Sequence, residues 1–239
     1  MVIAVWGRDG IGKSTLCDTL GRMFAKKGVT VIIDTDLTQP TLPMRLNGVK
    51  VDADASLGKA IGIGAMDAAP YLHQHPKIKT LFYAGLSDHD EYLSYELGLE
   101  SDNAAQDFVE LCEELADTVI LDLSGQRSDP FLPGALIHAD KIITLFMPDV
   151  QGICWLNSIK PLIGTMNAQE RILPVAVKTY KQHNLSVVEK ATDTKLVVAM
   201  PYVRELQQGG ISDGASRSSI RYHREAKKLQ TLLKGVDAK

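Results

Sequence analysis

The feature that most constrains the fold is a regular alternation of short apolar, β-branched runs with amphipathic helical patterns. Continuous apolar runs of this length are typical of strands buried on both faces, and intervening helices are typical of parallel connections. The pattern predicts an α/β fold with a doubly wound, mostly parallel β-sheet and helices on both faces. The expected strands are 2–6, 29–34, 78–83, 118–123, 141–146, 172–177 and 195–199.

The expected helices follow from the spacing of apolar residues between these strands. In the first of them, Leu16, Leu20, Met23 and Phe24 recur at the helical period and form one face that can be buried. We expect helices at 13–27, 104–116, 150–164, 184–192 and 217–234, and short helices in the proline-containing stretch 38–77. Because no internal repeat, low-complexity tract or linker interrupts the chain, we interpret residues 1–239 as one domain.

Composition and charge argue against several classes of protein. Hydrophobic residues make up 45% of the chain and charged residues 23%, which is typical of globular domains, and the net charge is -3. No apolar run reaches the roughly 18–20 residues of a membrane-spanning helix, and the N-terminus lacks the basic region of a signal peptide. The cysteines Cys17, Cys112 and Cys154 have no metal-binding spacing, so we expect buried, reduced thiols. We therefore expect a cytoplasmic protein without direct membrane insertion.

A glycine-rich segment stands between the first expected strand and the first expected helix. It reads G-R-D-G-I-G-K-S-T and matches the pattern G-x-x-x-x-G-K-[ST]. In this context the pattern predicts a phosphate-binding loop, in which glycines let the backbone wrap around phosphates and the helix N-terminus adds positive charge. We expect Lys13 to reach the β- and γ-phosphates and Ser14 to bind Mg²⁺. The nucleotide-binding residues expected in the loop are Gly7, Asp9, Gly10, Ile11, Gly12, Lys13, Ser14 and Thr15.

Carboxylates follow two of the other expected strands. Asp34 and Asp36 leave the second strand at positions i and i+2, so they point to the same side, into the crevice at the carboxyl ends of the strands. The strand 118–123 contains Asp122, the arrangement of a Walker B motif that holds Mg²⁺ through water. Gly125 follows, and its backbone N–H could contact the γ-phosphate. Alternatively, Asp34 and Asp36 only cap a helix or form a turn.

The loop and the strand ends resemble those of the MinD/ParA family of ATPases, whose deviant Walker A loop reads G-K-G-G-[IV]-G-K-[ST]-T. The family's extra lysine reaches the partner's nucleotide across an ATP-bound dimer, and Arg8 takes its position here. Arginine is always charged and can hold phosphate with two donors, although Arg8 could instead be an exposed residue paired with Asp9. The resemblance implies Lys13, Asp36 and Arg8 as catalytic residues, with Asp36 positioning the attacking water, and Ser14, Asp34 and Asp122 at the metal.

Two departures from the family pattern concern the nucleotide. Asp9 replaces a glycine, and a carboxylate beside phosphates is unfavourable unless it points away or pairs with Arg8. The guanine-reading pattern [NT]-K-x-D does not occur after the strand 172–177, which argues against a GTPase. By resemblance, Lys178 is the counterpart of the family's adenine-reading asparagine, and Pro201 is a wall of the base pocket. ATP and Mg²⁺ are the implied cofactors.

The resemblance implies an ATPase that dimerises with ATP and changes partners on slow or partner-stimulated hydrolysis. The run D-L-S at Asp122, followed by D-P-F, and the run M-P-D at 147–149 look most like the TadZ/CpaE branch, which positions pilus and secretion machinery, so an unidentified protein partner is expected.

Two alternatives stay open. Residues 217–239 hold seven basic and two acidic residues, so a partition-type ATPase could bind nonspecific DNA there, although the same helix could simply pack on the sheet. A small-molecule ligase similar to dethiobiotin synthetase would require a substrate pocket in 38–77.

Overall fold

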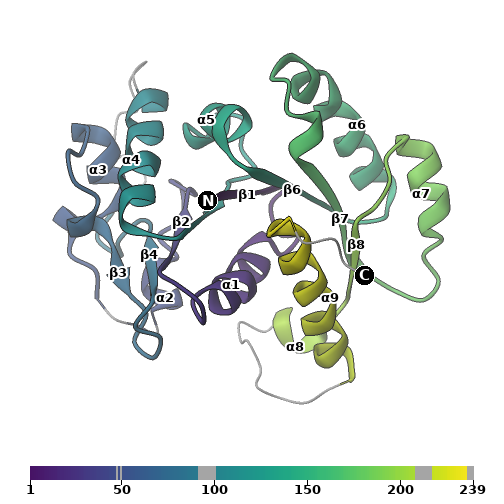
Figure 1. Cartoon of the computed structure of the whole chain (residues 1–239), viewed down its shortest axis with the longest axis horizontal. Helices are drawn as coiled ribbons and strands as arrows, with labels where there is room; N and C mark the ends of the chain where they lie inside the picture. The colour runs from purple at the N-terminus through teal and green to yellow at the C-terminus, as the bar shows by residue number, and fades with distance from the viewer. Residues whose placement is uncertain (47, 49, 91–100, 208–216, 236–239) are drawn as a thin grey trace.

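The computed structural model describes residues 1–46, 48, 50–90, 101–207 and 217–235. Within these residues the strands form one sheet in the order β3-β4-β2-β5-β1-β6-β7-β8 (Figure 1). All neighbouring strands are parallel except β3 and β4. The strands are β1 (Val2–Gly7), β2 (Thr30–Asp34), β3 (His73–Gln74), β4 (Leu81–Ala84), β5 (Thr118–Asp122), β6 (Lys141–Phe146), β7 (Ile172–Thr179) and β8 (Val198–Pro201).

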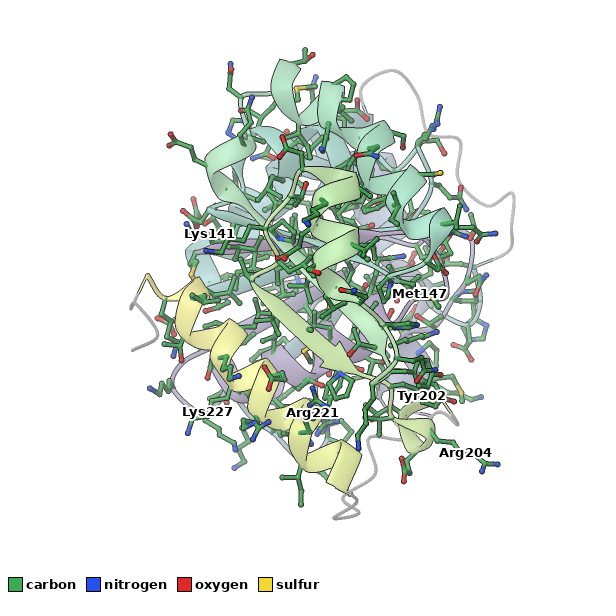
Figure 2. The ribbon with its side chains drawn as sticks, turned by 90° about the vertical axis from the view of Figure 1, so that its right-hand side faces the viewer. Lys141, Met147, Tyr202, Arg204, Arg221 and Lys227 are labelled. Atoms are coloured by element: carbon green, nitrogen blue, oxygen red, sulfur yellow. The ribbon has the colours of Figure 1, made fainter. Side chains whose placement is uncertain are left out.

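The helices cover both faces of this sheet, as the sequence predicts. They are α1 (Lys13–Phe24), α2 (Leu42–Arg45), α3 (Leu57–Ile63), α4 (Ser101–Leu115), α5 (Phe131–His138), α6 (Val150–Thr165), α7 (Leu185–Thr192), α8 (Arg204–Gln207) and α9 (Arg217–Leu233). Alternate residues of each strand serve the two faces: Val2 and Ala4 pack with helices α3 to α7, whereas Ile3 and Val5 pack with α1, α2 and α9. Helix α9 lies against β8 and α1 (Figure 2).

The strand order places a crevice at the carboxyl end of β1. The chain winds outward in both directions from β1, and ligands of open parallel sheets bind where the order reverses in this way. The segments that follow β1, β2 and β5 therefore meet at one edge of the sheet. In the register of β2 and β5, Asp34 is paired with Asp122.

Several boundaries and three elements differ from the sequence-based expectation. Helices α5 and α8 and the short strand β3 are absent from it. Pro133 and Gly134 suggest a loop, but Pro133 falls in the first turn of α5, where no backbone N–H is needed. Strand β4 begins at Leu81, because Ile78 N donates to His75 O and Leu81 N to Ile78 O in a turn.

Smaller differences concern single segments. Helix α1 ends at Phe24 rather than at residue 27, and β8 begins at Val198 rather than at residue 195. Cys17 and Cys112 are buried as expected, but Cys154 is exposed on α6, so the expectation of a buried thiol is wrong there. In the described residues, no helix combines the length and apolar character needed to cross a membrane.

Candidate functional site

The segment between β1 and α1 has a backbone conformation that only its glycines adopt easily. Gly10 and Gly12 have φ values of 72° and 107°, in the left-handed region. Gly12 directly precedes α1, and the N–H groups of the first turn of an α-helix have no partners within the helix. Together with the positive end of the helix dipole, these donors favour an anion at this position.

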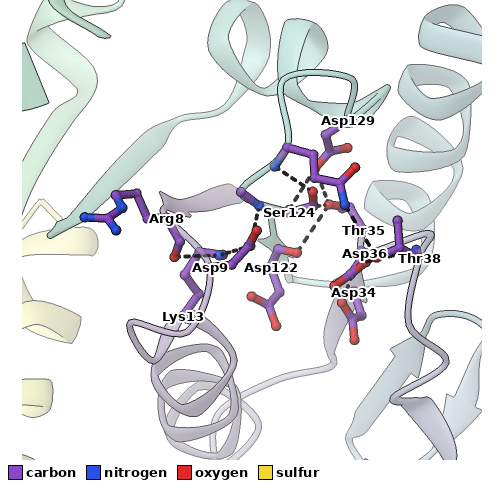
Figure 3. Close-up of polar contacts among 12 residues, drawn as sticks. Arg8, Asp9, Lys13, Asp34, Thr35, Asp36, Thr38, Asp122, Ser124 and Asp129 are labelled. Atoms are coloured by element: carbon purple, nitrogen blue, oxygen red, sulfur yellow. Dashed lines mark hydrogen bonds and ion pairs between the residues drawn. The ribbon is translucent and has the colours of Figure 1, made fainter. Parts of the chain in front are cut away.

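Lys13 lies beneath this loop, and its ammonium group donates hydrogen bonds to two oxygen atoms of the loop. Its Nζ donates to the backbone oxygen of Arg8 at 3.0 Å and to Oδ1 of Asp9 at 3.2 Å, and Lys13 is only 8% exposed. The same Oδ1 accepts the backbone N–H of Gly125 at 2.9 Å (Figure 3). The carboxylate of Asp9 thus accepts from Lys13 Nζ and from the N–H of Gly125, the two donors expected to bind a terminal phosphate.

Arg8 points away from Asp9, to the other side of the loop (Figure 3). Its Nη2 donates to Oε1 of Gln151 in α6 at 2.7 Å, in an exposed position. The alternative of an Arg8–Asp9 pair is therefore wrong, since Asp9 is paired with Lys13 at 3.2 Å. The carboxylate of Asp9 neither points away from the phosphate position nor pairs with Arg8.

Asp34 and Asp122 lie side by side at the ends of β2 and β5, and both are buried. The guanidinium of Arg45, the last residue of α2, contacts both of them. Its Nη2 is 3.3 Å from Oδ2 of Asp34 and forms a closer ion pair and hydrogen bond with Oδ2 of Asp122. Asp18 of α1 adds a third carboxylate, with its Oδ1 3.8 Å from Nη1 of Arg45.

The protonation of this cluster follows from its burial. Burial raises the pKa of Asp34 to about 6; Arg45 opposes this rise and Asp122 adds to it. Burial likewise raises the pKa of Asp18. Burial alone lowers the pKa of Arg45, but the carboxylates of Asp34, Asp122 and Asp18 raise it far above its ordinary value. The guanidinium is therefore charged, and the carboxylates favour further positive charge near them.

Asp36 forms a turn at the wall of the same crevice. Its Oδ1 accepts the backbone N–H of Thr38 at 2.9 Å and the Thr38 hydroxyl at 2.5 Å (Figure 3). Its own N–H donates to Oδ1 of Asp34 at 3.3 Å. The turn expected as the alternative role of Asp36 is formed, and Asp36 is among the residues that line the crevice.

A buried network joins the segment after β2 to the segment after β5. The hydroxyl of Thr35 donates to Oδ2 of Asp129, and the backbone N–H of Ser124 donates to Oδ2 of Asp129 at 2.8 Å (Figure 3). Burial raises the pKa of Asp129 to about 7, although hydrogen bonds from Thr35, Phe131 and Ser124 oppose the rise. Asp129 thus couples the two segments through its carboxylate.

Two cavities share the glycine loop. One, of about 500 Å³, extends from Gly12, Lys13, Ser14 and Thr15 to the strand ends with Asp34, Asp36 and Asp122. The other, of about 420 Å³, lies between the loop and the ends of β7 and β8. Gly10, Gly12 and Thr15 line both. A charged cavity that adjoins a mixed polar and apolar one has the form expected for phosphates next to a base.

The second cavity contains the residues predicted to contact a base. Lys178 and Pro201 line it together with Ile11 and Tyr202. Lys178 has a φ of 52°, and its Nζ donates to the backbone oxygen of Gly10 at 2.8 Å. Lys178 therefore braces the loop, and it stands where the resemblance placed an adenine-reading side chain. Gly7, which was expected to contact the nucleotide, lines neither cavity: it is buried, and a side chain there would collide with Leu145 O and Ile11.

Sequence reasoning missed three residues of the site: Arg45, Asp18 and Asp129. Arg45 stands among apolar residues in L-P-M-R-L, and a lone arginine between buried leucines is a signal that it has a buried partner. Asp18 follows Ser14 by one helical turn and so faces the same side of α1. Asp129 belongs to the D-P-F run, in which no local pattern indicates a buried carboxylate.

The carboxylates also bear on the expected magnesium ion. The structure shows no cluster of three or more His, Cys, Asp or Glu that could hold a metal ion among the described residues. Magnesium, however, needs only one or two carboxylates beside waters and phosphate oxygens. Asp34, Asp122 and the hydroxyl of Ser14 supply oxygen donors of the right chemistry, so the residues fit Mg²⁺, with Arg45 at the same carboxylates.

No model of a known protein family matches the sequence, and no curated protein matches it either. Solved structures do match, over nearly the whole chain. The ParA family ATPase from Chlorobium tepidum TLS matches with a TM-score of 0.77 at 14% identity, covering 96% of this chain and 98% of that one. The MinD cell division protein of Aquifex aeolicus matches with a TM-score of 0.74 at 16% identity, covering 100% and 98%.

A third similar structure contains a nucleotide. The septum site-determining protein MinD complexed with Mg-ADP from Pyrococcus horikoshii OT3 matches with a TM-score of 0.75 at 14% identity, covering 100% of this chain and 98% of that one. What the chain shares with these proteins is the α/β fold with its mostly parallel sheet.

Proposed function

We propose that the chain is an ATP hydrolase of the MinD/ParA kind that binds ATP with Mg²⁺ in the crevice above β1. The observation that carries the proposal is the position of Lys13, whose Nζ lies under a loop with two left-handed glycines and beside a carboxylate-lined cavity. The fold shared with MinD and ParA ATPases supports it, as does the Mg-ADP of the Pyrococcus protein.

In this proposal the loop and Lys13 hold the phosphates. The backbone N–H groups around Gly10 and Gly12 and the first turn of α1 donate to phosphate oxygens, and Lys13 exchanges Asp9 for a terminal phosphate. The N–H of Gly125 makes the same exchange. Lys178, Pro201 and Ile11 line the space for the base.

Hydrolysis requires a positioned water and balanced charge more than covalent chemistry. Asp36, at the edge of the phosphate cavity, positions the water. Ser14, Asp34 and Asp122 would hold a magnesium ion, which would neutralise part of the phosphate charge. Arg8, which points out of the loop on its far side, supplies positive charge to the nucleotide of a second copy across an ATP-dependent dimer.

The cellular role that we propose is the positioning of machinery in the cytoplasm. The runs D-L-S, D-P-F and M-P-D favour the TadZ/CpaE-like branch and hence a protein partner in pilus or secretion assembly. ATP would join two copies and slow hydrolysis would separate them, so that each state binds different partners.

A second candidate, partition-type DNA binding, is favoured by the outer face of α9. Arg221, Arg224, Lys227 and Lys228 are exposed there, and Figure 2 shows Arg221 and Lys227 on the outside of the helix. Glu225 pairs with Lys228 at 2.9 Å and with Arg224 at 3.5 Å, which reduces the free charge. Titration of duplex DNA across salt concentrations, with and without ATP, separates the two functions, because only the partition reading requires salt-sensitive binding with ATP.

The proposed function is tested first at Lys13. We expect Lys13→Ala to weaken ATP binding by about a hundredfold or more. The two charge-assisted contacts of Lys13 with the β- and γ-phosphates would be lost, and together they are worth roughly 3 kcal/mol. Calorimetric titration with ATP and Mg²⁺ measures the effect. Lys26→Ala, an exposed lysine beyond the end of α1, is the matched control and should bind ATP as the wild type does. Unchanged ATP affinity in Lys13→Ala would overturn the assignment of the site.

A further inference from the structure

Arg45 contacts the two carboxylates that, in the proposed function, would hold the magnesium ion. Its Nη2 contacts Oδ2 of Asp122 and lies 3.3 Å from Oδ2 of Asp34, the two carboxylates that end β5 and β2. The Arg45 side chain is 8% exposed, and those of Asp34 and Asp122 are 7% and 2% exposed. A guanidinium and a magnesium ion are both positively charged, so they compete for these carboxylates.

The fit of Arg45 in this position is incomplete. In the part of the chain that the structure describes, its buried Nη1 has no hydrogen-bond partner, and Asp18 is 3.8 Å away from it. One guanidinium faces three carboxyl groups in a buried cluster, so the carboxyl groups outnumber their cationic partner. A buried ion pair is favourable only when its remaining donors and charges are satisfied, and here they are not.

The packing of α2 holds the backbone of Arg45 but not the end of its side chain. Leu42 and Leu46, on either side of Arg45, are 0% and 1% exposed and belong to the core beneath the sheet. The hydroxyl of Thr41, the residue before α2, also donates to Oδ2 of Asp34. The guanidinium is thus joined to α2 only through the rotatable bonds of its own side chain, whereas the leucines fix the helix on the core.

We propose that Arg45 is the resident counter-ion of the magnesium site and that it excludes a divalent cation until a nucleotide brings one. This proposal rests on the proposed function, since it concerns the cation of that function. In the nucleotide-free protein Arg45 neutralises Asp34 and Asp122. Entry of the cation requires Arg45 to release both carboxylates, so free metal binds weakly and metal together with nucleotide phosphates binds well. Arg45 is thus a positioning residue that makes metal binding depend on the nucleotide.

The test uses Mn²⁺ alone as the probe, with the full chain and no nucleotide. Electron paramagnetic resonance of free Mn²⁺ measures its affinity. We expect Arg45→Gln to bind Mn²⁺ at least tenfold more tightly than the wild type, and Asp122→Asn in the same chain to remove the gain. Arg171→Gln is the matched control: Arg171 is half-buried and donates to the backbone oxygens of Ala139 and Leu136, so its loss should not alter Mn²⁺ affinity.

Removal of a guanidinium from buried carboxylates can destabilise the fold strongly, so circular dichroism first establishes that Arg45→Gln is folded. If it is not, Arg45→Lys replaces it: the shorter, single ammonium covers fewer carboxylate oxygens, and Mn²⁺ affinity should still rise severalfold. A folded Arg45 variant that binds Mn²⁺ no better than the wild type would overturn the proposal. Failure of the wild type to bind ATP would instead refute the proposed function, and the nucleotide-free Mn²⁺ measurement would still decide the role of Arg45.

Discussion

At the scale of single residues, Asp9 determines how the donors of the glycine loop are paired. Its Oδ1 takes both the ammonium group of Lys13 and the N–H of Gly125. A carboxylate has the charge and the acceptor geometry of a phosphate oxygen, so the loop without nucleotide is already satisfied from within. In the proposed function a terminal phosphate displaces this carboxylate, whereas a glycine at position 9 would offer no such competitor.

We therefore predict that Asp9→Ala increases the affinity for ATP by about three- to tenfold. The Asp9 side chain is 66% exposed, so solvent weakens its contacts to roughly 1 kcal/mol. The affinity for ADP should rise less, because Gly125 is assigned to the γ-phosphate. Calorimetric titration with each nucleotide measures the ratio, and Asp9→Asn, which removes the charge and keeps the size, should give a similar rise. Equal or weaker ATP binding in both variants would contradict the role of Asp9.

At the scale of elements, the segments that follow β2 and β5 are one unit rather than two loops. Thr35 N donates to Asp122 O at 3.1 Å, and Asp129 accepts from both Thr35 and Ser124. Asp129 is 5% exposed and lies just before α5. Its carboxylate also accepts the N–H of Phe131 at 2.9 Å. A movement of either segment therefore changes the surroundings of the other.

The buried carboxyl of Asp129 predicts a pH dependence of stability. Burial raises its pKa to about 7 from an ordinary value of 3.8, so between these pH values the folded chain binds a proton that the unfolded chain does not. Its contribution to stability is therefore present at low pH and is lost as pH rises towards 7. Thermal unfolding measures this effect. Between pH 5 and pH 8 the midpoint temperature of Asp129→Asn should fall by a few degrees less than that of the wild type.

The control for this prediction is Asp117→Asn, which removes an exposed carboxylate that also accepts a backbone N–H, that of Val29. Its unfolding midpoints should follow the wild-type pH dependence. Parallel curves for Asp129→Asn and the wild type over the same range would show that Asp129 does not couple protonation to folding.

At the scale of the whole molecule, the question is whether two copies share one reaction. Arg8 and Asp36 lie on opposite sides of the loop (Figure 3), and the Arg8 side chain donates to Gln151 in an exposed position. In a symmetric dimer each subunit would give its Arg8 to the partner and keep its own Asp36. The two residues would then belong to different subunits in each reacting site.

This arrangement predicts complementation between two impaired variants. We expect Arg8→Ala and Asp36→Ala each to bind ATP but to hydrolyse it at least tenfold more slowly, with more ATP-bound dimer of Asp36→Ala in sedimentation. An equal mixture should recover about one quarter of the wild-type rate, because half of the dimers are mixed and each holds one complete site. A mixture no faster than its components would show that Arg8 does not act across a dimer.

Much of the fold could be predicted from the sequence, because it depends on local patterns. The strands near 2–6, 118–123 and 141–146 are confirmed, since buried parallel strands need continuous apolar runs. Helices such as α1 and α6 are confirmed because apolar residues at the helical period mark the face that packs on the sheet. Helix α5 escaped prediction because its apolar residues are not confined to its buried face, as the exposed Ile137 shows, and because it contains Pro133 and Gly134.

The sequence by itself determined the glycine loop, the lysine at its base and the carboxylates at the strand ends, because these are set by the order of residues within single segments. Only the tertiary structure decided how the charges are paired. Asp9 meets Gly125 across 116 positions of the chain, and Arg45 meets Asp122 across 77. Pairing of this kind depends on which strands become neighbours, and no local pattern records it. The loop at residues 7–15 can therefore be predicted from the sequence. The pairing of Asp9 with Lys13 and Gly125, and of Arg45 with Asp122, is a property of the folded chain.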